Sequence, residues 1–430
     1  MIAPLPPAPR ILSLDVIRGI AVMGIFSVNV IAFAMIEPAY FNPGAFGGHR
    51  GADLAMWLAN YVLIDGKMRS LFSMLFGASM LLVIDRAEAS GRSPAKVHFT
   101  RMVTLLGFGL LHFYFVWRGD ILALYAMVGM VAFLFRKAGV EKLLAIGTIL
   151  MLATAALFSF GAMQLGKSDA AAHRPNATAA EIRRWNDSAG HLVASPGASA
   201  TETRIARAPF AERARHMLTQ RTADPFSAAL GFGFPTLGLM LFGMAGYRTG
   251  FLTGAWPRRR YRQIALATLG IGGLVTLALG LWVIQSNFHV VTIFFAFFGL
   301  GGPIELAMAF GYAALIILCM RQGGALTARF AAVGRAAFSN YLGTSLITAG
   351  IFYGDGLALF GRVSRAEAWL VVPAMWLLML AWSKPWLDRF AYGPFEWAWR
   401  SLAKWSLEPM RKRPSLDGRM GPPLARVDTL

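Results

Sequence analysis

Cysteine is almost absent from this chain, because Cys319 is the only one among 430 residues. A single cysteine excludes a disulfide framework and any metal site built on several thiolates. Charged residues are also scarce: they make up 15% of the chain, compared with about 25% in soluble globular proteins. The composition therefore lies outside the range of soluble globular proteins.

Several catalytic signatures are missing as well. The chain contains no GxSxG, HExxH or Walker sequence, which argues against a familiar hydrolase, zinc protease or ATPase. We expect no metal. The formal charge of +19 would suggest nucleic-acid binding in a soluble protein. Here the basic residues gather in short loops between apolar stretches, so nucleic acid is not an expected partner.

Apolar residues dominate what remains. Hydrophobic side chains make up 56% of the chain, aromatic ones 13%, and the mean hydropathy is +0.53. Interfacial Trp and Tyr anchor membrane spans, and the 45 glycines allow helices to approach closely. This composition predicts an all-α protein that crosses a membrane several times, with membrane lipids around it.

The first long apolar stretch, Leu12–Ile36, carries the strongly polar residues Asp15, Arg18 and Asn29. Its length is enough for a helix to cross a hydrocarbon core of about 30 Å. At about 100° per residue, the three side chains fall within about 60° of one another on one face. An ionisable side chain inside a membrane costs free energy unless it is paired or faces a water-filled cavity, so this face is expected inside a helical bundle. The alternative is a purely structural Asp15–Arg18 pair at the membrane surface.

The remaining apolar stretches bring the expected number of transmembrane helices to about ten. They divide the chain into a first membrane half (1–163), an extracytoplasmic polar segment (164–225), a second membrane half (226–390) and a basic tail (391–430). Within the polar segment, two stretches read as short helices, 179–189 and 206–220.

Lysine and arginine set the expected orientation. One side collects the basic loops around 86–101, 136–142, 258–262 and 321–329 together with the C-terminal tail, whereas the other side's short loops hold few basic residues. The positive-inside rule makes the first side cytoplasmic, with both termini inside. We therefore expect a multi-pass protein of the bacterial inner membrane. The sequence leaves homodimer formation open.

Several polar residues near the outer side could carry chemistry. His112 lies eight residues before Asp120, about two helical turns into a span. It could act as a general base, or it could simply bond a backbone carbonyl of a neighbouring helix. Asp65 and Arg69 are spaced i,i+4, which predicts an ion pair between them.

A second candidate site follows the glycines and the proline of Gly299-Leu-Gly-Gly-Pro303. These residues predict a broken helix, and Glu305 lies just beyond the break. Exposed carbonyls at such a break need a cavity or a neighbouring helix.

The chain resembles the YeiB-like family, a bacterial inner-membrane family of unassigned function. The segments that carry this resemblance are Ser13-Leu-Asp-Val-Ile-Arg-Gly-Ile-Ala21 with Asn29, Lys67-Met-Arg-Ser-Leu-Phe-Ser-Met-Leu-Phe-Gly77, Leu110-Leu-His112 with Trp117-Arg-Gly-Asp-Ile-Leu122, Gly334-Arg-Ala-Ala-Phe-Ser-Asn-Tyr-Leu342 and Tyr392-Gly-Pro-Phe-Glu-Trp-Ala-Trp-Arg400. They span nearly the whole chain outside 164–225.

The first of these segments also resembles the opening of the heparan-α-glucosaminide N-acetyltransferase family, whose members move an acetyl group from cytosolic acetyl-CoA to a sugar amine across the membrane. This resemblance implies Asp15, Arg18 and Asn29 as site residues. It departs at the family's catalytic histidine, whose place is taken here by Tyr40. His49 and His112 are the candidates to replace it.

Two functions are therefore expected from the sequence. One is acyl transfer from cytosolic acyl-CoA to an extracytoplasmic acceptor, with His112 or His49 as catalytic base and with substrate contacts from Asp15, Arg18, Asn29, Arg69, Asp120 and Glu305. The other is a transporter or lipid-handling protein with a midplane site around Gly299–Glu305.

Overall fold

The computed structural model describes residues 10–189, 193 and 195–412. These residues form helices and loops, with one antiparallel bridge between Phe390 and Arg411. The helices are α1 (Leu12–Ala34), α2 (Glu37–Phe41), α3 (Gly51–Leu63), α4 (Lys67–Ala89), α5 (Pro94–Phe115), α6 (Leu122–Ala132), α7 (Val140–Ala172), α8 (Ala179–Ala189), α9 (Pro196–Arg207), α10 (Phe210–Gln220), α11 (Asp224–Arg248), α12 (Arg258–Gln285), α13 (Val290–Phe294), α14 (Gly301–Cys319), α15 (Ala325–Arg335), α16 (Ala337–Phe352), α17 (Arg365–Trp369), α18 (Val371–Arg389) and α19 (Pro394–Lys404). The expected all-α architecture is confirmed for this part of the chain.

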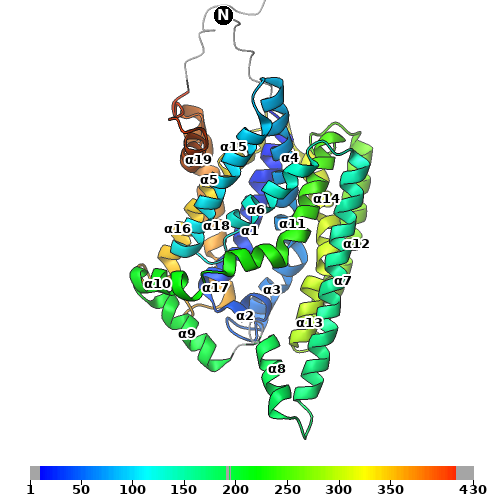
Figure 1. Cartoon of the computed structure of the whole chain (residues 1–430), viewed down its shortest axis with the longest axis vertical. Helices are drawn as coiled ribbons and strands as arrows, with labels where there is room; N and C mark the ends of the chain where they lie inside the picture. The colour runs from blue at the N-terminus through cyan, green and yellow to red at the C-terminus, as the bar shows by residue number, and fades with distance from the viewer. Residues whose placement is uncertain (1–9, 190–192, 194, 413–430) are drawn as a thin grey trace, which may run out of the picture.

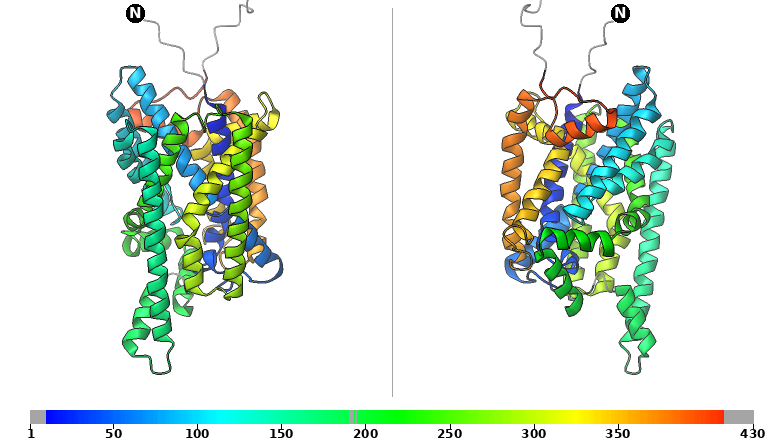
Figure 2. Two further views of the ribbon diagram at one scale, coloured as in Figure 1. Left: turned by 90° about the vertical axis from the view of Figure 1, so that its right-hand side faces the viewer. Right: turned by 60° about the vertical axis from the view of Figure 1, so that its left-hand side comes forward.

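Helix α1 is the core of the bundle (Figures 1 and 2). It packs against α4, α15 and α16, and its side chains contribute to two separate hydrophobic clusters. The approach to α15 is close because Gly334 has no side chain: a Cβ there would lie 1.8 Å from the carbonyl oxygen of Asp15. The sequence therefore places a small residue where two helix backbones touch.

The outer helices turn large apolar side chains away from the protein. The exposed side chains include Leu157 and Phe160 of α7 and Leu266 and Leu274 of α12. In the most apolar 18-residue stretch of either helix, less than a quarter of the residues are buried. Such surfaces suit lipid rather than water. Within the described residues, seven helical segments are long and apolar enough to cross a membrane. This supports an integral membrane protein, whereas the number ten stays a prediction.

The predicted helix break is confirmed. Helix α13 leads into a π-helical turn over Phe295–Gly299, and α14 starts afresh at Gly301. π-Helical turns inside α-helices are often found at functional sites. The two short helices expected in the polar segment also form, as α8 and as α10, which begins four residues later than expected; α9 before it was not predicted.

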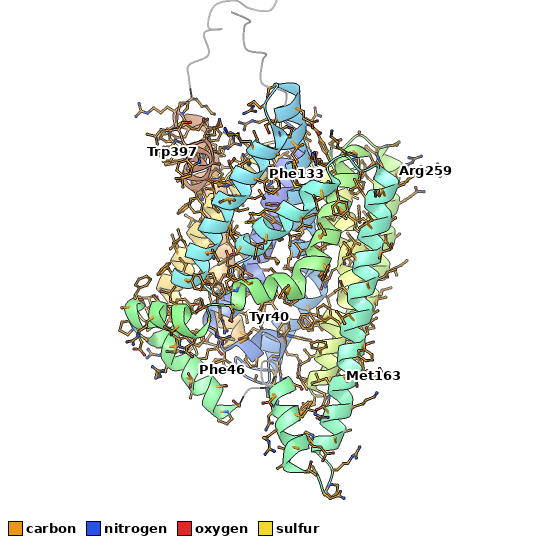
Figure 3. The ribbon with its side chains drawn as sticks, in the orientation of Figure 1. Tyr40, Phe46, Phe133, Met163, Arg259 and Trp397 are labelled. Atoms are coloured by element: carbon orange, nitrogen blue, oxygen red, sulfur yellow. The ribbon has the colours of Figure 1, made fainter. Side chains whose placement is uncertain are left out.

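The bundle has two distinct ends. Arg259, Phe133 and Trp397 lie at one end, which we call the basic end, and Tyr40 and Phe46 lie toward the opposite end (Figure 3). The start of α1 and helix α19 share the basic end, whereas α8 and α9 lie toward the opposite end (Figure 1). The expected grouping of both chain ends on one side is consistent with this arrangement, and the side of the membrane stays a prediction.

Candidate functional site

The clearest catalytic geometry joins the end of α5 to the start of α6. Nδ1 of His112 lies 2.9 Å from Oδ1 of Asp120, and both side chains are almost completely buried. Oδ2 of Asp120 accepts a hydrogen bond of 2.8 Å from the backbone N–H of Ala123 in the first turn of α6. An ionised Asp120 carboxylate can only accept hydrogen bonds, so in that state Nδ1 of His112 donates the proton of this pair. In a neutral ring Nε2 is then left with its lone pair, as a general base requires.

The histidine bonds a carboxylate rather than the backbone carbonyl that a structural role predicted. Its Nε2 is buried and has no hydrogen-bond partner among the described residues. The neighbouring Trp117, whose ring centre is 6.3 Å from that of His112, has an equally buried and unpartnered Nε1. A buried polar atom without a partner costs about 1–3 kcal/mol, so two such atoms on neighbouring rings point to a site for a water molecule or a substrate.

A second polar group, the α3–α4 cluster, consists of Tyr40, Asp65, Lys67, Arg69 and Glu305. Tyr40 donates a hydrogen bond of 2.8 Å to Asp65, and Arg69 lies 3.6 Å from Glu305. The predicted Asp65–Arg69 pair is therefore wrong, because each residue finds its partner on a more distant element. Lys67 is buried and donates to the carbonyl of Tyr61. The side chain of Arg69 remains 50% accessible, so its single long ion pair leaves donors free for another group.

Gly66 makes the contact between α4 and α14 possible. Its φ is +72°, in the left-handed region, and a Cβ at this position would lie 1.9 Å from the carboxyl carbon of Glu305. The carboxylate of Glu305 thus occupies the space that a side chain at residue 66 would fill.

Tyr40 does not take over the chemistry of the histidine whose place it occupies. Burial and the adjacent Asp65 carboxylate raise the pKa of Tyr40 well above its ordinary value. Its hydroxyl therefore stays protonated and acts as a donor, not as a base.

One tyrosine lies beside each of these two groups. The Tyr125 hydroxyl on α6 lies 2.7 Å from Oγ of Ser73 and 3.5 Å from the carbonyl oxygen of Arg69. The Tyr341 hydroxyl on α16 accepts from the N–H of Ile121 at 3.4 Å, and its ring packs on His112 with centres 5.2 Å apart. Since Asp120 and Tyr125 lie within about two turns of each other, α6 brings the two groups into one region.

On the polar face of α1, Arg18 is hydrogen-bonded to neighbouring side chains, whereas Asn29 has no partner among the described residues. Arg18 bonds Asp15 at 3.0 Å and Oγ of Ser79 at 2.6 Å, so it fastens α1 to α4. Asn29 is half-buried and makes no hydrogen bond with any described residue. One turn further on, Phe33 stacks on Trp117 with ring centres 4.2 Å apart. The free amide of Asn29 thus faces the same side of α1 as the contact with Trp117.

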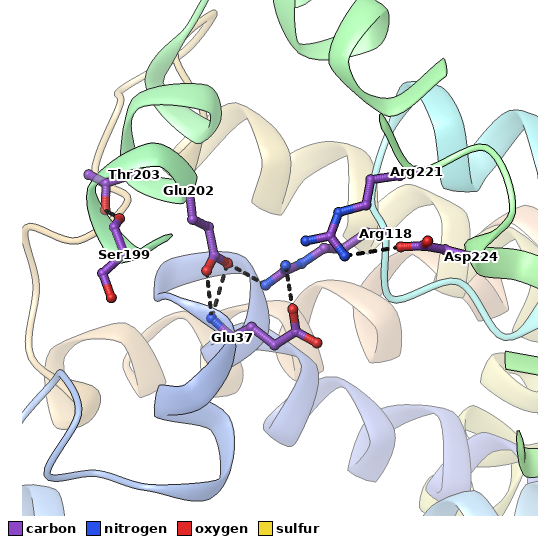
Figure 4. A network of polar contacts seen from close by, with 7 residues as sticks. All are labelled: Glu37, Arg118, Ser199, Glu202, Thr203, Arg221 and Asp224. Atoms are coloured by element: carbon purple, nitrogen blue, oxygen red, sulfur yellow. Dashed lines mark hydrogen bonds and ion pairs between the residues drawn. The ribbon is translucent and has the colours of Figure 1, made fainter. Parts of the chain in front are cut away.

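A cavity of about 390 Å³ lies beside this region, toward the opposite end. Trp117 lines it, together with residues from the end of α5 and from α9 and α10. Figure 4 shows its polar wall: Arg118 lies between Glu37, at 2.9 Å, and Glu202, which also accepts from the backbone N–H of Glu37. Burial raises the pKa of the Glu202 carboxyl, against the opposing attraction of Arg118.

His49 is not part of this region. It is exposed in the loop between α2 and α3 and makes no hydrogen bond with a described residue. Among the described residues, no group of three or more His, Cys, Asp or Glu side chains is arranged to hold a metal ion.

The comparisons with known proteins agree on one family. The chain is 31% identical to "Uncharacterized protein YxaH" of Bacillus subtilis, over 94% of this chain and 96% of that protein. It is also 31% identical to "Uncharacterized protein YeiB" of Escherichia coli, over 91% of this chain and 96% of that protein. The chain belongs to the YeiB family. Residues 246–406 match the family model described as "Protein of unknown function (DUF418)", and no solved structure matches.

Several residues of this YeiB-family site were not identified from the sequence. Trp117 and Tyr341 stand inside the segments that carried the family resemblance, which is the signal that could have singled them out. Tyr125 lies in an apolar stretch where a buried hydroxyl gives no periodic signal, so the sequence offered little to find it.

Proposed function

We infer that this YeiB-family membrane protein transfers an acyl group from cytosolic acyl-CoA to an acceptor at the opposite face of the inner membrane. The observation that carries this proposal is the buried His112–Asp120 pair, whose Nε2 lacks a partner beside Trp117. An aspartate that holds one ring nitrogen protonated leaves the other free to accept a proton, which is the arrangement of a general base.

The reaction assigns one role to each group. The acceptor O–H or N–H loses its proton to Nε2 of His112 while its heteroatom attacks the thioester carbonyl. The carbon–sulfur bond then breaks, and the CoA sulfur leaves as a thiolate that takes up a proton to give the free thiol. The half-accessible guanidinium of Arg69 supports negative charge on the carbonyl oxygen, and Asn29 orients the thioester.

The donor reaches this site along α1. Arg18, near the basic end, attracts the anionic CoA, and Asn29 lies about 16 Å further along the helix axis. Because Arg18 is also bonded to Asp15 and Ser79, its substitution is expected to affect stability as well as donor binding.

Release of CoA thiol from acetyl-CoA in proteoliposomes tests the proposal. A Cys319→Ser background removes the exposed native thiol. His112→Gln is expected to lower the rate about 10²- to 10⁴-fold, the range of general-base catalysis, while acetyl-CoA still raises the melting temperature. A hundredfold excess of ligand over its dissociation constant stabilises a protein by about 2.7 kcal/mol. The matched control is His49→Gln at the exposed loop histidine, which should leave the rate unchanged.

A transporter is the second candidate, supported by the π-helical turn and by Glu305 beside Arg69. If no acyl-CoA raises the melting temperature, and Glu305→Gln alone abolishes the cellular phenotype, acyl transfer must be abandoned for transport.

A further inference from the structure

The cavity is lined by the C-terminal end of α5 and by residues of α9 and α10. Exposed apolar side chains lie along one face of α5, at Phe99, Val103, Leu111 and Phe115, with the exposed Gly107 between the second and third. Leu111 is 58% exposed. The opposite face of α5, which includes His112, is buried. A helix with one apolar face outward and one packed face borders lipid on its outward side.

This apolar stripe continues onto the rim of the cavity. Phe115 is both the last residue of the stripe and a lining residue, and its ring centre lies 6.3 Å from that of Phe210 on α10. Phe210 is itself exposed, as is Leu218 on the same helix. Helix α11 carries a similar exposed stripe, at Phe226, Leu230 and Phe234. The mouth of the cavity is therefore bordered by side chains that suit hydrocarbon.

The interior combines apolar and charged walls. Trp117, Tyr353 and Phe360 supply aromatic surface. Three arginines also line the cavity: Arg118 pairs with Glu37 and Glu202, Arg221 uses one nitrogen to bond Asp224 at 3.1 Å, and Arg213 bonds Asp355 at 2.7 Å. Arg118 is shared between the two carboxylates, whereas the side chain of Glu37 is 42% exposed and keeps one oxygen without a partner (Figure 4). Cationic and anionic groups in one small wall match a ligand that carries both charges.

We propose that this cavity binds the headgroup of a zwitterionic phospholipid from the outer leaflet. The phosphate meets Arg221 and Arg118, the ammonium meets Glu37, and the acyl chains stay in the bilayer along the Phe115–Phe210 edge. A volume of about 390 Å³ suits a headgroup and leaves the chains outside. Trp117, whose buried indole N–H has no partner among the described residues, belongs to the same wall. If acyl transfer is the function, this lipid is the acceptor, and that part of the inference rests on the proposed function.

Photo-crosslinking in lipid nanodiscs tests the binding site without any acyl transfer. A phosphatidylethanolamine probe with a photoreactive group near its headgroup is expected to label residues 113–118 and 210–221. Unlabelled phosphatidylethanolamine should compete with the probe, and anionic phosphatidylglycerol should not. This comparison uses the unaltered protein, so it does not depend on the folding of a variant. Labelling confined to residues 99–111, or equal competition by both lipids, overturns the zwitterionic headgroup site.

A pair of isosteric variants then tests the ammonium contact. Glu37→Gln should lower the yield of cross-linked protein about tenfold, because one charge-assisted contact is lost. Glu212→Gln removes the same charge from α10 at an exposed carboxylate that pairs with Arg204, and it should leave the yield unchanged. Equal yields from the two variants overturn the role of Glu37. Cross-linking without any CoA release in the unaltered protein leaves the lipid site standing and overturns both the acceptor role and the proposed acyl transfer.

Discussion

Replacing Asp120 with asparagine isolates the role of the histidine pair, because the side chain keeps its size and loses only its second acceptor. The carboxylate accepts from His112 through one oxygen and from the N–H of Ala123 through the other. An amide offers one acceptor oxygen, so it satisfies one of these donors. If the amide oxygen stays with Ala123, its NH₂ group faces Nδ1 of His112 and drives the ring proton to Nε2.

The expected magnitudes differ for folding and for catalysis. Loss of one buried hydrogen bond should lower the free energy of unfolding by about 1–3 kcal/mol. Protonation of Nε2 removes the base itself, and substitution that imposes the wrong tautomer lowers catalytic rates by about 10⁴-fold in serine hydrolases. The Asp120→Asn variant should therefore still fold and bind acyl-CoA, but it should transfer the acyl group far more slowly.

The assay is CoA thiol release in proteoliposomes, run beside thermal unfolding in detergent. Asp388→Asn is the control, since its exposed pair with Lys384 contributes at most about 1 kcal/mol. A rate within about threefold of the unaltered protein, together with a lowered melting temperature, would show that Asp120 and His112 only hold α5 to α6. The general-base reasoning is then refuted.

Three further predictions concern the frame around the site. Gly66→Ala should lower the free energy of unfolding, because φ of Gly66 is +72° and the Glu305 carboxylate fills the space of a Cβ atom. Backbone strain by itself accounts for about 1–3 kcal/mol of this loss. Thermal unfolding measures the change, and a neutral effect would contradict this packing. Burial raises the pKa of Glu396, so the folded state binds its proton more tightly, and stability should rise as pH falls from neutral toward the carboxyl's ordinary pKa. Glu396→Gln should lose that rise, and an unchanged pH dependence of unfolding would exclude this cause. In a Cys319→Ser background, a membrane-impermeant thiol reagent added outside should label Gly197→Cys and miss Gly139→Cys, two exposed glycines with open space around them; the reverse pattern would invert the expected orientation.

Much of the architecture could be predicted from the sequence because it depends on local patterns. Apolar length identified α1 as a span, and helical periodicity placed Asp15, Arg18 and Asn29 on one face. Glycine and proline are local determinants of backbone geometry, so the break before Glu305 was also predictable. Composition established a helical membrane protein, since few charged residues remain to solvate a surface.

The partners of the polar residues were decided only by the tertiary structure. Periodicity predicted an ion pair between Asp65 and Arg69, yet Asp65 pairs with Tyr40 and Arg69 with Glu305. A buried charge is stabilised by whichever opposite charge or donor the packing brings nearest, and in a bundle that group belongs to a helix far away in sequence. His112 and Asp120 were both candidates in the sequence, but their contact depends on the reversal of the chain between α5 and α6. The cavity with its Arg118–Glu202 contact likewise exists only because α9 folds back over the bundle, and no local pattern encodes that return.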